Sequence, residues 1–176
     1  CAAETTYSEI GQNVGHHYNT HDPGAQNQVH QGVVYAHGHM AYLLELMRDA
    51  VDPMGNNLLD TGLVMSTSDC SIGLSHTVSR QPYVLVGGLR DRIKTGYHHQ
   101  VGGAYNGSNG QPNAAGNTSD VLYTILRAFN KDAPSIGDMT PRQMQGGWYG
   151  SGGNPGQKVV GSSTIIPEIT GPAFGT

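Results

Sequence analysis

The sequence predicts an α/β fold that contains part of a mostly parallel sheet, has helices on both faces of that sheet and is rich in loops. Two segments repeat apolar residues every three or four positions, which is the period of an amphipathic helix. Two short segments are continuously apolar, which is typical of strands buried on both faces. The 26 glycines and 9 prolines among 176 residues require many turns.

The first predicted element is a helix over residues 29–51, where apolar side chains recur with helical spacing and the charged residues are set apart from them. Asp52 and Pro53 end it, because a residue that precedes a proline avoids the helical conformation. A second helix is predicted over residues 118–129, with Asn117 or Ser119 as its N-terminal cap.

Two strands are predicted between these helices. Residues 58–68 form an apolar run rich in Leu, Val and Thr after a turn signal at residues 56–57, and residues 83–86 form a second run closed by two glycines. Weaker strand character returns at residues 159–160 and 164–166. Two Gly/Asn-rich stretches, 102–117 and 146–157, are predicted as loops of a length that usually lines a site or meets a partner.

These elements divide the chain into a polar N-terminal arm (1–15), an α/β region (16–145) and a Gly-rich loop with an extended C-terminal arm (146–176). Two helices cannot cover both faces of a sheet, and two or three strands make a poor sheet. We therefore expect the fold to be completed by another chain or by a missing N-terminal portion of the same precursor. Because Cys1 rather than Met comes first, we also expect a processed or trimmed chain. Three origins fit: a lipid-bearing Cys exposed by signal cleavage, an internal cut, or an end set in preparation. We favour the internal cut.

Composition and motifs exclude several classes of function. The net charge of −4, with 12% charged residues, offers no basic field for nucleic acid. No apolar run approaches the length of about 18 residues that a transmembrane segment needs. The standard nucleotide-binding and serine-hydrolase motifs, GxGxxG after a strand, GxxxxGK[ST] and GxSxG, are absent.

Nine histidines, as many as all the lysines and arginines together, require metal binding to be considered. His30 and His37 would lie about 10 Å apart along a helix, too far for one ion. His37 and His39 would point to opposite sides of it. We therefore interpret His37 and His39 as histidines hydrogen-bonded at a buried edge. An HExxH motif is absent, so zincin chemistry is excluded.

The most informative residue in the first strand region is Asp69, which follows the apolar run directly. An aspartate at the C-terminal end of a buried strand lies in the crevice where open α/β sheets bind ligands. A carboxylate there suits a hard divalent ion or zinc. The alternative is that Asp69 only caps the loop that follows.

Residues 58–69, which read LLDTGLVMSTSD, resemble the L-x-N-T-L-V-hydrophobic-x-T-S-D-H/N-G strand of sulfatases and other alkaline-phosphatase-superfamily enzymes. Residues 16–22, HHYNTHD, resemble the W-D-T-H segment of a related group of exported bacterial proteins of unassigned function, which also share an L-x-D-T-L-V strand. His76, the strand that ends in Gly-Gly, the IKTG turn at 93–96 and the DVLYTIL helix at 120–126 follow in that group's order. The resemblance covers residues 15–130 and corresponds to the C-terminal half of the superfamily fold.

The resemblance implies a metal site. It assigns Asp69, His21 and His76 as metal-ligand candidates, with Asp22 nearby, and His21 and His76 as catalytic proton donors. Two departures weaken this set: Asn19 stands where the related group has a metal-binding Asp, and Cys70 stands where superfamily members have His or Asn. The nucleophile and the first metal-binding Asp of the superfamily belong to its N-terminal half, which nothing here matches.

The resemblance thus implies a metal-dependent phosphate- or sulfate-ester hydrolase subunit or fragment that uses a divalent metal (zinc, calcium, magnesium or manganese) and acts on a small anionic ester. A second polypeptide or N-terminal portion would complete it, and the location would be periplasmic, cell-surface or secreted. One alternative is a non-catalytic member of the superfamily that serves as a structural, surface or carbohydrate-binding component. Another is an unrelated small metal-binding domain.

Overall fold

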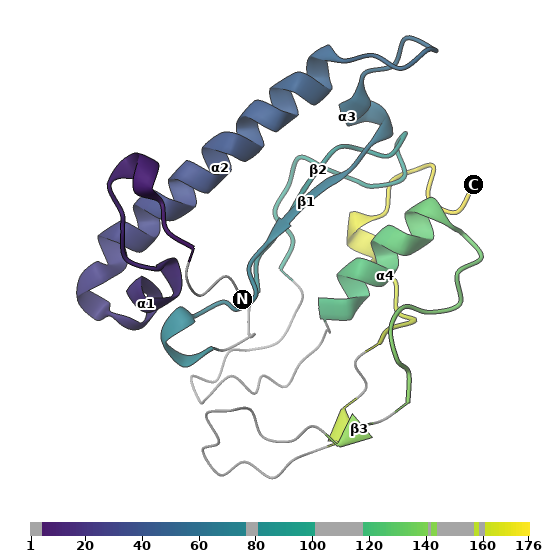
Figure 1. Ribbon diagram of the computed structural model, residues 1–176. Helices are drawn as coiled ribbons and strands as arrows, with labels where there is room; N and C mark the ends of the chain where they lie inside the picture. Colours follow the sequence, from purple (N-terminus) through teal and green to yellow (C-terminus); the bar gives the residue numbers. More distant parts are fainter. Residues whose placement is uncertain (1–4, 77–80, 101–117, 141, 144–156, 159–160) are drawn as a thin grey trace. The chain divides into compact units, whose positions relative to one another are not determined.

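The computed structural model describes residues 5–76, 81–100, 118–140, 142–143, 157–158 and 161–176, and they form a mixed α/β structure (Figure 1). The described residues fall into two compact units, one up to residue 87 and the other from residue 88 onward. The first unit contains α1 (His16–His21), α2 (Gln26–Asp49), α3 (Leu58–Thr61), β1 (Val64–Thr67) and β2 (Tyr83–Val86). The second contains α4 (Thr118–Phe129), β3 (Arg142–Gln143) and β4 (Gln157–Lys158).

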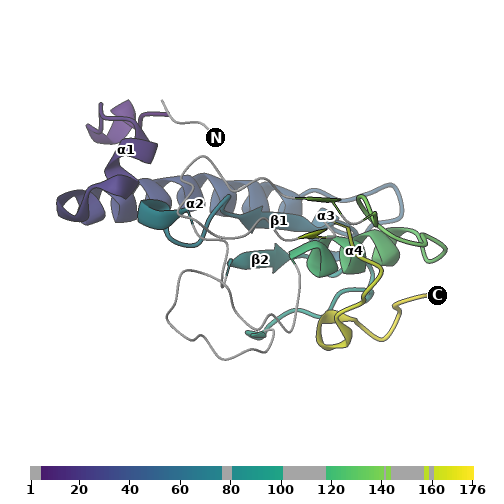
Figure 2. The same cartoon turned by 90° about the horizontal axis from the view of Figure 1, so that it is seen from below.

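The long helix α2 confirms the helix predicted over residues 29–51 and begins three residues earlier. A single turn of 3-10 helix, Pro23–Ala25, leads into it, and the Asp22 side chain caps that turn by accepting a hydrogen bond from the Gly24 amide at 2.8 Å. The chain leaves the helical conformation at Ala50, two residues before Asp52. The short helix α1 lies against the N-terminal end of α2, as Figures 1 and 2 show.

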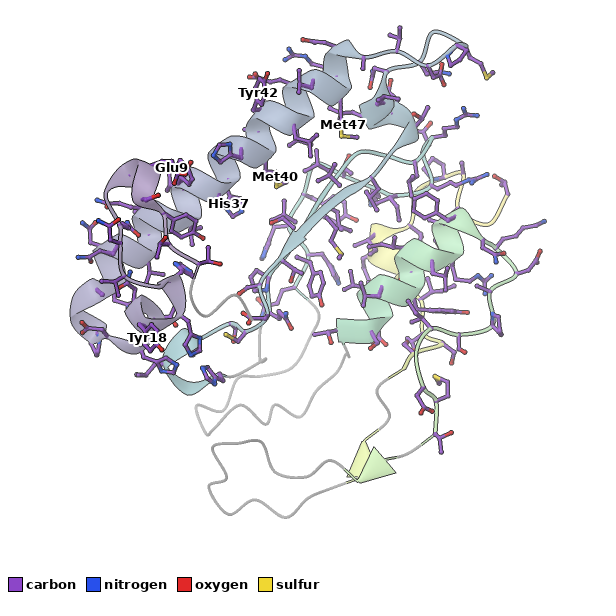
Figure 3. The ribbon with its side chains drawn as sticks, viewed as in Figure 1. Glu9, Tyr18, His37, Met40, Tyr42 and Met47 are labelled. Carbon is purple, nitrogen blue, oxygen red and sulfur yellow. The ribbon has the colours of Figure 1, made fainter. Side chains whose placement is uncertain are left out.

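Only part of the apolar surface of α2 is covered. Met40 and Met47 are half-buried and lie on the side of α2 that faces α3 and the two strands, whereas Tyr42 points away from them and is 62% exposed (Figure 3). The exposed fraction lies between 43% and 56% for four further apolar residues of this helix, Val33, Val34, Leu43 and Leu46. His37 and His39 are exposed too, so the prediction of a buried edge for them was wrong.

Residues 5–15, expected as an arm, form a tight turn that packs on α2. Tyr7 pairs with Gln12 in a β-bridge, and the Gln12 side chain donates a hydrogen bond to the carbonyl of Gln28 at 2.9 Å. The ring of Tyr7 lies so close to Gly32 that a Cβ at that position would stand 2.7 Å from it. Gly32 therefore allows residues 5–15 to pack closely against α2.

The strand predicted over residues 58–68 was wrong for its first part. Residues 58–61 form the single helical turn α3, and the strand β1 begins only at Val64. The physical reason is capping: the Asn57 side chain accepts a hydrogen bond from the Asp60 amide at 2.9 Å and donates one to the Asp60 carboxylate at 2.7 Å. These two bonds stabilise a helical N-terminus and outweigh the strand propensity of the apolar residues.

The second predicted strand is confirmed, and β2 covers residues 83–86 as expected. β1 and β2 pair antiparallel, with Val64 opposite Val86 and Thr67 opposite Tyr83. A mostly parallel sheet is not seen in the part of the chain that the structure describes. Burial alternates along β1, where Met65 is 40% exposed, so the described residues cover one face of this pair better than the other.

In the second unit, α4 confirms the helix predicted over residues 118–129. Its buried face holds the segment from residue 161 onward through hydrogen bonds: Ser162 donates to the Asp120 carboxylate at 2.6 Å, and the Ile166 amide donates to the Thr124 hydroxyl at 2.9 Å. The structure has no strand at residues 164–166, contrary to the prediction, because these bonds run to helix side chains rather than to a neighbouring strand. Residues 162–166 thus bond to α4, and the segment that follows bonds to the backbone of residues 91–94 through residues 169–173.

Some predictions fall outside the described residues: the loop over 102–117, including the cap Asn117, nearly all of the loop over 146–157 and the strand character at 159–160. Among the helices that the structure describes, none is both long and apolar enough to cross a bilayer.

Candidate metal centre

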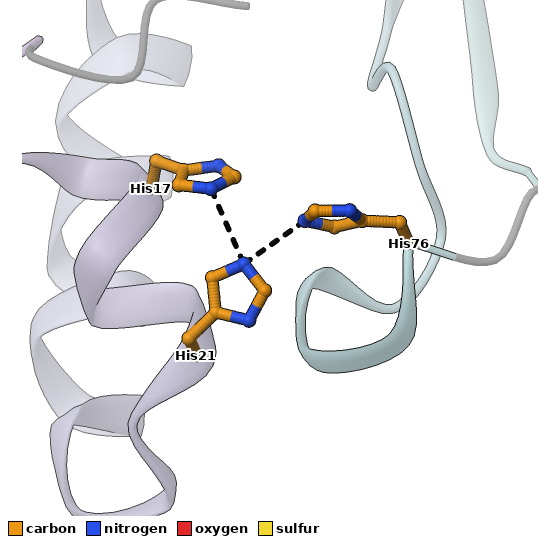
Figure 4. A group of neighbouring side chains, drawn as sticks. All are labelled: His17, His21 and His76. Carbon is orange, nitrogen blue, oxygen red and sulfur yellow. Dashed lines mark hydrogen bonds between the residues drawn. The ribbon is translucent and has the colours of Figure 1, made fainter. Parts of the chain in front are cut away.

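Three histidine side chains of the first unit converge on one point (Figure 4). The Nε2 atom of His21 lies 3.2 Å from Nε2 of His17 and 2.9 Å from Nε2 of His76. One ring nitrogen from each of the three lies within 4.8 Å of the other two, and all three side chains are half-buried. In the described residues this is the one group of at least three His, Cys, Asp or Glu side chains arranged closely enough to share an ion.

Helix α1 positions two of these histidines. Residues four apart on a helix lie on the same face, so His17 and His21 project side by side. A helix of six residues is unstable in isolation. It is held here by packing against α2 and by a 2.7 Å hydrogen bond from the His16 amide to the carbonyl of Thr5.

The third histidine comes from the connection between β1 and β2. His76 follows the 3-10 turn Gly73–Ser75 and adopts a left-handed backbone conformation, with φ 51° and ψ 35°. Non-glycine residues adopt this conformation rarely and often at functional sites. The turn can lie this close to α1 only with glycine at position 73, because a Cβ there would clash with the side chain of Thr20 on α1. Because glycine has no side chain, the turn can lie close to α1, and His76 comes within reach of the α1 histidines.

The structure brings together two of the four residues predicted as metal ligands. His21 and His76 belong to the group, whereas Asp22 caps the turn after α1 and Asp69 accepts a hydrogen bond from the thiol of Cys70 at 3.6 Å. Neither aspartate is a member of the group. The catalytic and metal-binding roles of all four residues stay predictions.

The two residues that depart from the superfamily pattern lie close to this group in sequence. Asn19 is a buried residue of α1, and Cys70 is half-buried. Burial, followed by the charge of Asp69 and the hydrogen bond to it, raises the pKa of the Cys70 thiol. The neutral thiol is thereby favoured, which makes Cys70 a poorer metal ligand than a thiolate.

Sequence reasoning missed His17. The available signal was the spacing of four residues between His17 and His21, which places two imidazoles on one face of a helix. That signal requires a helix at residues 16–21, and six polar residues give no apolar periodicity from which to predict one.

The donor set fits a divalent transition metal, because neutral imidazole nitrogen is a common ligand for such ions. Fold and site together define an α/β protein with a candidate three-histidine metal centre. No model of a known protein family matches this chain, and neither the curated proteins nor the solved structures with which it was compared gave a match. Its relation to the alkaline-phosphatase superfamily is therefore a proposal.

Proposed function

We propose that this protein is a metal-dependent hydrolase of phosphate or sulfate esters, related to the alkaline-phosphatase superfamily. The observation that carries the proposal is the meeting of His21 and His76, whose Nε2 atoms lie 2.9 Å apart although 55 residues separate them in sequence. The sequence resemblance independently assigns metal-ligand roles to these two residues. A metal centre is the chemistry that such a pair, joined by His17, supports best.

The three imidazoles would hold the ion. When bound, a divalent ion supplies Lewis-acid stabilisation of the negative charge that develops on the transferring phosphoryl or sulfuryl group. The resemblance gives His21 and His76 an alternative role, because an imidazole that does not bind the ion can donate a proton to the leaving oxygen. The nucleophile would come from the portion of the fold that the resemblance does not cover.

The exposed apolar surface supports a larger assembly. Four apolar residues of α2, Val33, Val34, Leu43 and Leu46, are each at least 40% exposed, and so are Met65 on β1 and Val84 on β2. We propose that a second polypeptide or an N-terminal portion of the same precursor covers these surfaces and supplies the parallel strands. The antiparallel β1–β2 pair is compatible with this, because mostly parallel sheets often carry an antiparallel edge strand. From the resemblance we also propose a periplasmic, cell-surface or secreted location.

A non-catalytic role is the second candidate, and Asn19 and Cys70 favour it. Asn19 is an uncharged amide where the resembling group has a metal-binding Asp, and Cys70 is a thiol of raised pKa where superfamily members have His or Asn. Such a protein would keep the fold and serve as a structural, surface or carbohydrate-binding component.

The test uses the protein isolated with every chain that copurifies. Elemental analysis should find a divalent metal in near-stoichiometric amount, and p-nitrophenyl phosphate or p-nitrophenyl sulfate should be hydrolysed. A chelator and the His21→Ala variant should each abolish turnover, whereas His37→Ala, on the exposed face of α2, should not. Stoichiometric metal without turnover of either ester would favour the non-catalytic role, and turnover that survives both the chelator and His21→Ala would refute the proposed site.

A further inference from the structure

We propose that His17 is the third ligand of an all-nitrogen site, formed with His21 and His76, that takes a zinc-class transition-metal ion and rejects calcium and magnesium. This inference rests on the metal site of the proposed function. It adds a ligand that the sequence resemblance does not contain, and it selects one class among the four ions that the resemblance allows.

The spacing of the nitrogens matches what zinc requires. Zinc binds imidazole nitrogen at about 2.0–2.1 Å in tetrahedral geometry, which separates neighbouring ligand nitrogens by about 3.3 Å. The two Nε2–Nε2 distances from His21, to His17 and to His76, are 3.2 and 2.9 Å. One ring nitrogen from each of the three histidines lies within 4.8 Å of the other two, so the three rings surround a single position.

Hydrogen bonding alone accounts poorly for the cluster. The Nε2 atom of an imidazole carries either one hydrogen or one lone pair, so it makes one good hydrogen bond in the plane of its ring. Nε2 of His21 faces two such atoms, one on His17 and one on His76 (Figure 4). One hydrogen bond from His21 can satisfy only one of these two neighbours. A cation between the rings would accept a lone pair from all three.

The chemistry of the donors selects the ion. Calcium and magnesium take oxygen ligands, whereas imidazole suits zinc, copper, nickel and iron. In the part of the chain that the structure describes, the group contains three imidazoles and no carboxylate. Three protein ligands also leave one of the four positions that zinc prefers for a water molecule or a substrate oxygen.

The sample is the full chain together with any chain that copurifies. It is titrated with ZnCl₂ in a calorimeter and with CoCl₂ in an absorption spectrometer. We expect one high-affinity ion per chain, the intense visible absorption of four-coordinate cobalt and no binding heat with CaCl₂ or MgCl₂. His17→Ala should weaken zinc binding at least roughly tenfold, because even groups that only orient metal ligands contribute about 10- to 100-fold. The matched control His37→Ala should bind zinc like the wild type, because His37 is exposed on α2, where its Nδ1 donates to the carbonyl of Val33.

A second measurement needs no variant. Zinc should protect His17, His21 and His76 of the wild-type protein from modification by diethyl pyrocarbonate, as mapped by mass spectrometry, while His37 remains reactive. The inference is overturned if His17 is modified equally with and without zinc, if His17→Ala binds zinc as tightly as the wild type, or if calcium or magnesium competes equally. Ester hydrolysis supported by magnesium without zinc binding would refute this inference alone, whereas zinc binding at His17 without hydrolysis would refute only the proposed function.

Discussion

The ring nitrogens of His21 and His76 face each other at 2.9 Å, although one residue ends a six-residue helix and the other follows a turn 55 residues later. Two segments thus contribute to one cluster, and each is held by contacts outside it. The positioning of this pair decides whether the two rings can bind one ion together with His17.

Gly73→Ala should displace His76. The new methyl group would collide with the Thr20 side chain, so the turn at residues 73–75 must move away from α1. We expect zinc affinity to fall at least roughly tenfold, because ligand positioning contributes that much at metal sites. Calorimetry measures the effect. Gly38→Ala is the matched control, since nothing lies within 4 Å of that position, and an equal loss in both variants would contradict the positioning role of Gly73.

Gly32→Ala should destabilise the first unit. A Cβ there would stand 2.7 and 2.9 Å from two ring atoms of Tyr7, which is a severe overlap with a rigid ring. Overpacking of this kind costs about 1–3 kcal/mol in the free energy of unfolding. Denaturant unfolding measures it, with Gly38→Ala on the same helix as the control, because alanine at that open position should raise stability by up to about 1 kcal/mol. Equal stabilities of the two variants would mean that residues 5–15 do not pack on α2.

Asp69→Asn should make the Cys70 thiol more reactive. Burial is the largest cause of its raised pKa, and the charge and the hydrogen bond of Asp69 raise it further, so removing the charge lowers the pKa toward that of a free thiol. The thiolate fraction at pH 8 then increases, and alkylation of Cys70 by iodoacetamide should accelerate roughly twofold or more. Peptide-level mass spectrometry separates Cys70 from Cys1.

The same Asp69→Asn variant tests the sequence-based ligand assignment. Because Asp69 is not a member of the three-histidine group, we expect the zinc dissociation constant to remain unchanged. A large loss of zinc affinity would show instead that Asp69 is a ligand, as the resemblance implies.

Ser162→Ala should loosen the C-terminal segment of the second unit. Ser162 is 4% exposed and donates a 2.6 Å hydrogen bond to the Asp120 carboxylate, and a hydrogen bond to a charged group contributes about 1.5–3 kcal/mol. Hydrogen exchange of the residue 166 amide, which binds Thr124, should accelerate. Ser163→Ala is the control because Ser163 is exposed, and equal exchange in both variants would contradict the role of Ser162.

The sequence predicted the elements with strong periodicity. The helices α2 and α4 and the strand β2 follow from apolar spacing, which reports directly which residues need burial. The turn α3 was missed because its stability comes from two side-chain hydrogen bonds of Asn57, which an apolar count does not detect.

The site was predicted in part. His21 and His76 were found through motif resemblance, but their meeting depends on the left-handed backbone of His76 and on the contact between Gly73 and Thr20. Neither feature has a signature in a single sequence. His17 was missed because α1 owes its stability to packing on α2 rather than to its own residues.

X-ray absorption spectroscopy at the zinc edge of the zinc-loaded protein identifies the ligands of the ion directly. We expect three imidazole ligands with zinc–nitrogen distances of about 2.0 Å, and two in the His17→Ala variant. A spectrum without imidazole scattering, or one dominated by sulfur at about 2.3 Å, would contradict the three-histidine centre.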